Sequence, residues 1–197
     1  MDKKSKIYLL IVILAFFLAL IGIYIAYTAS TAIEFDVKFS SLPINSQKTI
    51  PKASLALQSP KNNYQVGETI PVKIILDTQN NPVDGVDVIL VYPADNIEPQ
   101  ADNLLDKTNS VFANIIGPKT DAVKREIKFS ALPLPHNSFV DRGEVATINF
   151  LAASTGQAEI KILFVKDSAS ESDSNVSYYL EAKDILSQAT GLTIQIQ

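Results

Sequence analysis

The chain has 197 residues, with 17 Lys and Arg against 21 Asp and Glu, and it contains no cysteine. Without cysteine no disulfide can stabilise the fold, so stability has to come from a hydrophobic core. A net charge of −4 with no basic stripe argues against a nucleic-acid-binding surface.

The first 27 residues predict a membrane anchor. Every residue from 7 to 27 is apolar, Gly or Tyr, and as a helix this run would span about 31 Å, close to the thickness of a bilayer core. Lys3, Lys4 and Lys6 precede it, which places residues 1–6 in the cytoplasm and everything after Tyr27 outside the cell. We therefore expect a single-pass cell membrane protein with one transmembrane α-helix. A signal peptide cleaved near Ala32 is the alternative, but the apolar run is longer than such peptides usually have.

Residues 28–51 form a polar connecting segment that contains Pro43 and Pro51. Its composition indicates a stalk between the membrane and a domain at 52–197. Apolar residues also alternate with polar ones from Ile33 to Phe39, which is typical of a strand. Both interpretations of this segment stay open.

From residue 52 onward the dominant pattern is alternation of apolar and polar residues. It recurs around residues 54–58, 126–131, 145–150, 158–164 and 192–197, with turn residues between. Half-buried strands at this spacing predict an all-β sandwich. Two long apolar runs are joined by Gln79–Pro82, a pattern that predicts adjacent antiparallel strands. Only residues 95–107 and 180–188 suggest short helices.

Several short motifs follow one another in a fixed order. The chain has Gly67-Glu68-Thr69, then Asp77-Thr78, Gly85-Val86-Asp87 and Tyr92-Pro93, and predicted strands follow at 143–150, 155–164 and 189–197. This order resembles that of a cohesin, the module that receives dockerins in cellulosomes. The resemblance covers roughly residues 52–197. It implies an antiparallel, jelly-roll-like sandwich that binds a dockerin-like protein and is not an enzyme.

A candidate binding face follows from the strand that begins at Gly85. Asp87, Ile89 and Val91 lie on the side opposite Val86, Val88 and Leu90. The two aliphatic residues either pack under another element or form an exposed patch. The resemblance implies a dockerin contact at Asp87, and alternation adds four outward residues of other strands as weaker candidates: Lys128, Ser130, Thr147 and Asn149.

The remaining chemistry of the sequence is sparse. The single histidine, His136, lies in a proline-rich loop and is expected to be solvated, and no zinc-ligand spacing is present. The serine-rich loop 167–175 carries enough oxygen ligands to hold calcium. Its candidate ligands are Asp167, Glu171, Asp173 and Asn175.

Two other functions compete with dockerin binding. A carbohydrate-binding module of the same sandwich superfamily would act in polysaccharide binding or degradation, but it relies on exposed aromatic faces. The chain has no Trp, and only four Tyr follow the anchor: Tyr64, Tyr92, Tyr178 and Tyr179. A structural surface or pilus-like subunit is the third possibility.

Overall fold

The computed structural model describes residues 18, 20, 21, 50–93, 95–166 and 172–197. The chain divides into two units, Met1–Gln47 and Lys48–Gln197. In the first, the three described residues are helical. No helix within the described ranges is both long enough and apolar enough to cross a bilayer. The predicted tail at 1–6 lies outside these ranges, as do nearly all of the predicted anchor at 7–27 and of the predicted stalk at 28–51, so these segments stay predictions.

The regular secondary structure described in the second unit is almost entirely strand. In chain order they are β1 (Ala53–Gln58), β2 (Asn63–Tyr64), β3 (Thr69–Asp77), β4 (Val83–Val91), β5 (Ile97–Pro99), the 3₁₀ turn η1 (Ala101–Asn103), β6 (Leu105–Asp106), β7 (Asn114–Asp121), β8 (Glu126–Leu132), β9 (Arg142–Ala152), β10 (Gly156–Ile162), β11 (Asn175–Tyr178), β12 (Lys183–Asp184), β13 (Leu186–Thr190) and β14 (Leu192–Ile196).

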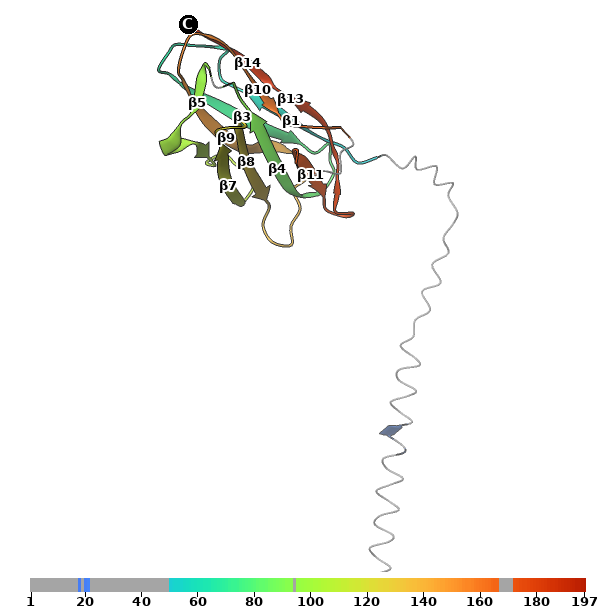
Figure 1. Ribbon diagram of the computed structural model, residues 1–197. Helices are drawn as coiled ribbons and strands as arrows, with labels where there is room; N and C mark the ends of the chain where they lie inside the picture. The colour runs from blue at the N-terminus through green and yellow to red at the C-terminus, as the bar shows by residue number, and fades with distance from the viewer. Residues whose placement is uncertain (1–17, 19, 22–49, 94, 167–171) are drawn as a thin grey trace, which may run out of the picture. The chain divides into compact units, whose positions relative to one another are not determined.

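These strands form two sheets (Figure 1). The first sheet has the order β13-β1-β3-β9-β5, with β6 also paired to β9. The second sheet has the order β12-β11-β4-β10-β14-β2, and the hairpin β7–β8 joins it through β4. Two pairs, β1 with β13 and β14 with β2, are parallel. The predicted all-β sandwich is therefore confirmed, but it is not purely antiparallel.

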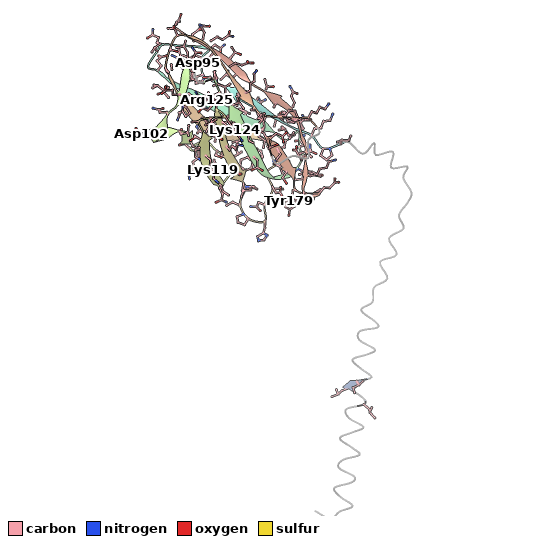
Figure 2. The ribbon with its side chains drawn as sticks, viewed as in Figure 1. Asp95, Asp102, Lys119, Lys124, Arg125 and Tyr179 are labelled. Carbon is pink, nitrogen blue, oxygen red and sulfur yellow. The ribbon has the colours of Figure 1, made fainter. Side chains whose placement is uncertain are left out.

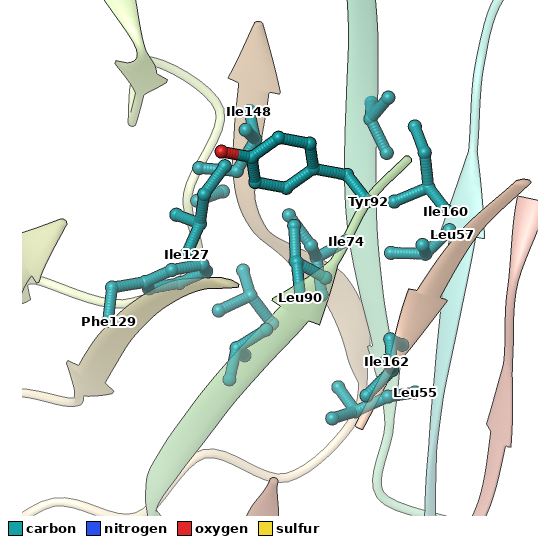
Figure 3. Close-up of a cluster of buried hydrophobic side chains, with 14 of the residues drawn as sticks. Leu55, Leu57, Ile74, Leu90, Tyr92, Ile127, Phe129, Ile148, Ile160 and Ile162 are labelled. Carbon is teal, nitrogen blue, oxygen red and sulfur yellow. The ribbon is translucent and has the colours of Figure 1, made fainter. Parts of the chain in front are cut away.

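The core lies between the sheets and is built by the predicted alternation. In β1, β8 and β10 every second side chain is buried and the others are partly or fully exposed. Phe150, Leu90 and Ile148 are fully buried, and Figure 3 shows Leu90 and Ile148 in one apolar cluster with residues from both sheets. Burial of such side chains contributes about 1.5–3 kcal/mol each, which is how a chain without disulfides can be stable.

The connector between β3 and β4 corrects one sequence interpretation. The strands do not pair with each other: β3 pairs with β1 and β9 in the first sheet, whereas β4 pairs with β8, β10 and β11 in the second. Gln79 and Asn80 both have positive φ angles, 51° and 66°, and Thr78 is fully buried. The tight turn therefore carries the chain across the sandwich, because both strands need their apolar sides to face the same core.

The two predicted helices were wrong. Residues 95–107 contain β5, η1 and β6, and residues 180–188 contain β12 and the start of β13. In both segments the backbone pairs with a longer strand, so a regular helix would leave hydrogen-bonding groups of that strand without partners. Pairing with the sheet overrides local propensity here.

Candidate functional site

The outer side of the second sheet brings one row of side chains together across four strands. Ile116 of β7 lies opposite Ser130 of β8, Ser130 lies opposite Asp87 of β4, and Asp87 lies opposite Asn175 of β11. Because the side chains of directly opposed residues point to the same face, this row forms a continuous strip. We call Ile116, Ser130, Asp87 and Asn175 the central row.

Asp87 is held in place within the central row. It is half-buried, and its carboxylate accepts a short hydrogen bond from the Ser130 hydroxyl. The sequence prediction grouped these two residues on one face, and the register confirms that placement. A carboxylate fixed in this way needs little further ordering to accept a hydrogen bond from a partner.

The next two rows toward the β7–β8 turn carry charges. Lys128 lies opposite Lys119, and Glu126 lies opposite Asp121. Lys128 Nζ is 2.9 Å from Glu126 Oε2, so this pair is neutralised along β8. The pKa of Asp121 is lowered, chiefly because the backbone N–H of Lys124 donates to its carboxylate. Lys119 is exposed and makes no ion pair with another described residue.

Ile89 does not contribute to this face, contrary to the expectation that it would be exposed. Its side chain is only 5% exposed. The backbone N–H of Ile89 donates to the hydroxyl of the fully buried Ser174 at 2.9 Å, and its carbonyl accepts from Leu163 at 2.8 Å. Leu163 and Ser174, which follow β10 and precede β11, therefore pack against this position. Val91 is half-buried.

Thr147 and Asn149 are also corrected, because they belong to the other sheet. Both lie on β9 in the first sheet, and each is 6% exposed. Asn149 Nδ2 donates to the carbonyl of Asn103, and Thr147 lies opposite Asp106 of β6. The segment from η1 to β6 thus covers them, and they cannot share a face with Asp87.

Exposed apolar side chains near the central row were missed from the sequence. Ile116 is 60% exposed and Leu132 is 38% exposed. The alternation of apolar and polar residues did not identify them, because a bulge interrupts the register of β7 between Ile116 and Lys119. A bulge adds a residue to one strand and reverses the alternation beyond it, so adjacent Ile115 and Ile116 could not be assigned to faces by counting.

The predicted calcium ligands are only partly described. Asp167 and Glu171 lie outside the described residues. Asp173 is 5% exposed, and its Oδ2 accepts the backbone N–H of Val165 at 2.8 Å; Asn175 lies on β11 in the central row. Within the described ranges no three His, Asp or Glu residues are close enough to hold a metal ion. Calcium binding stays a prediction, and it would appear as a melting temperature that falls when EDTA is added.

The aromatic residues do not form a flat sugar-binding platform. Of the four Tyr residues in the second unit, Tyr64 and Tyr92 are buried, Tyr178 packs partly against the core and only Tyr179 is exposed, at 46%. One exposed ring is too small a surface for the stacking mode that carbohydrate-binding modules use.

Comparison with known sequences finds no matching family model and no matching curated protein. Comparison with solved structures is informative. A cohesin module from a family 33 glycoside hydrolase of Clostridium perfringens superposes with a TM-score of 0.57 at 10% identity, covering 75% of this chain and 98% of that one.

Two further solved structures agree. A non-cellulosomal cohesin from the archaeon Archaeoglobus fulgidus has a TM-score of 0.54 at 14% identity, covering 74% of this chain and 91% of its own. A type I cohesin–dockerin complex from Clostridium thermocellum gives 0.56 at 13% identity, covering 74% and 99%. At these identities the comparison concerns architecture alone. The second unit of this chain has the cohesin fold.

Proposed function

We propose that this protein is a membrane-anchored, extracytoplasmic cohesin-like module that binds a dockerin-type protein without forming a covalent bond. The observation that carries the proposal is the central row, an ordered strip of apolar, hydroxyl, carboxylate and amide side chains across β7, β8, β4 and β11. Solved structures that share its fold include cohesins in complex with dockerins.

The chemistry of the strip suits a protein surface. Ile116 and Leu132 supply apolar area at one end, and Asp87 offers a carboxylate that is already oriented by Ser130. Protein interfaces commonly combine an apolar anchor with oriented polar groups at their centre. We propose binding alone, without enzymatic activity, because non-covalent binding needs no catalytic groups.

Replacing Ile116 with Asp should weaken binding of a dockerin partner by about 2 kcal/mol, or roughly 30-fold, because the change puts a charge where the partner needs an apolar contact. The measurement is calorimetry or surface plasmon resonance with the full chain in mild detergent and a panel of purified dockerins. Asp87→Ala should also weaken binding, whereas Asp87→Asn keeps a hydrogen-bond acceptor for Ser130 and isolates the effect of the charge.

Val66→Asp is the matched control, because Val66 is also half-exposed but lies in the loop before β3. It should bind like the unmodified protein. A panel in which no dockerin binds, or in which Ile116→Asp and Val66→Asp have equal effects, would show that this face is not the partner site.

The location requires its own test. We expect the intact chain to stay in membranes after a carbonate wash and its residues beyond 50 to be open to external protease, because residues 7–27 carry no charge and follow three lysines. Replacing Leu14 and Phe17 with Lys should release the protein from membranes. Recovery of an unmodified soluble product that begins near Ile33 would indicate a cleaved signal peptide instead.

A further inference from the structure

A second candidate binding site lies away from the central row, between the β5–η1–β6 segment and the β7–β8 hairpin. The surface there has a hollow of about 790 Å³. This volume is within the usual range for small-molecule sites. Figure 2 shows Asp102 and Arg125, which line it, in the same region of the sandwich and far from Tyr179. Apolar residues from both sheets also line the hollow: Ile97, Leu105 and Pro118.

Tyr92 contributes a polar group to this hollow. The residue is only 5% exposed, and its ring packs against Phe150 with the ring centroids 5.4 Å apart. Figure 3 shows the hydroxyl at the margin of the apolar cluster on the side of Ile127. The hydroxyl makes no hydrogen bond to any other described residue, and it is not among the fully buried polar atoms that lack a partner, so it reaches the surface. It is therefore free to bind a ligand.

Arg125 lies beside Tyr92. Its backbone has a φ of 58°, which is uncommon for a residue with a side chain, and its carbonyl accepts the N–H of Tyr92 at 3.1 Å. Burial raises the pKa of Tyr92, and the nearby Arg125 charge offsets part of that effect. Arg125 forms no ion pair with the described residues. Two side chains that can donate hydrogen bonds, and that have no partner among the described residues, thus line the same hollow.

Acidic residues line the same hollow. Glu98 and Asp102 are both exposed. Together with Arg125 they give the lining a net charge of −1, which repels a doubly charged group such as phosphate more strongly than a single carboxylate. An Arg guanidinium matches a single carboxylate with two parallel hydrogen bonds. The carboxylates of Glu98 and Asp102 can accept hydrogen bonds only from donors.

We propose that this hollow binds a small monocarboxylate that carries hydrogen-bond donors at its other end. The ligand carboxylate contacts Arg125 and the Tyr92 hydroxyl, its carbon skeleton lies on Leu105 and Pro118, and its donors face Glu98 and Asp102. A uronic acid offers hydroxyl donors, and an ω-amino acid offers an ammonium donor at the end opposite its carboxylate. The site shares no residue with the central row.

The test is titration of the full chain in mild detergent with glucuronate and with 6-aminohexanoate, followed by calorimetry or by NMR shifts of Tyr92. Glucose serves as the matched probe without a carboxylate. We expect one of the two carboxylates to bind and glucose to bind at least about tenfold more weakly, because a charge-assisted hydrogen bond is lost. Which carboxylate binds identifies the donor class.

Two variants place the binding in the hollow. Tyr92→Phe removes only the hydroxyl, and Arg125→Asn removes the charge while keeping a residue that tolerates positive φ. Each should weaken carboxylate binding by about tenfold to a hundredfold, and Arg125→Asn should also raise the pKa of Tyr92. Lys124→Asn makes the same change in charge one position earlier. It should alter neither carboxylate binding nor the pKa of Tyr92. The proposal is overturned if neither carboxylate binds, if glucose binds equally well, or if Lys124→Asn and Arg125→Asn have equal effects.

Discussion

Replacing Ile89 with Lys should prevent the second unit from folding. The side chain is 5% exposed. The backbone of Ile89 hydrogen-bonds to the hydroxyl of the fully buried Ser174 and to the backbone N–H of Leu163. An ammonium group there would be removed from water, and an uncompensated buried charge typically costs about 3–5 kcal/mol. Since a domain has a total stability of only about 5–15 kcal/mol, such a loss leaves it marginal or unfolded.

The control is Val91→Lys on the same side of the same strand. Val91 is half-buried, so a lysine there can extend its ammonium group into water and the variant should fold. Circular dichroism with urea denaturation of both variants in the full chain makes the comparison. If Ile89→Lys had the urea midpoint of the unmodified protein, Ile89 would be accessible and could return as a candidate contact for the partner.

Replacing Phe150 with Ala should lower the free energy of unfolding by about 3–5 kcal/mol, the range for large aromatic residues in a core. Phe150 is fully buried on β9 and contacts the ring of Tyr92, which comes from the second sheet. Its removal therefore opens a cavity where the two sheets meet. The measurement is the midpoint of denaturant unfolding at constant m-value.

Leu151→Ala is the matched control for this prediction. Leu151 is the next residue on β9, points to the opposite side of the sheet and is 36% exposed. We expect its truncation to cost much less than that of Phe150. Equal losses from the two variants would contradict the assignment of the inner and outer sides of β9.

The candidate site shows where sequence reasoning succeeds. The alternation in β8 correctly placed Lys128 and Ser130 on the outer side of that strand, and in the structure β8 pairs with β4. Thr147 was grouped with them on the same kind of evidence, and it lies in the other sheet. Alternation shows which side of its own strand a residue takes, but it does not identify the neighbouring strand.

The hollow beside Tyr92 shows a second limit of sequence reasoning. Tyr92 directly follows β4, Asp102 lies in η1 and Arg125 is the last residue of the β7–β8 turn. No short motif connects them, because they meet only after β5 and β6 pair with β9 and the β7–β8 hairpin pairs with β4. Such a site can be found only from the packed structure.

By itself the sequence determined that the second unit is a cysteine-free, all-β domain whose strands bury one side, because the two-residue period of a strand is a local property. The tertiary structure decided which sheet each strand joins, that Ile89 is buried beside Ser174, and that Ile116 and Asp87 share one row. These outcomes depend on pairing between segments far apart in the chain. Such pairing is selected by how well two sheets enclose one core, which no local pattern specifies.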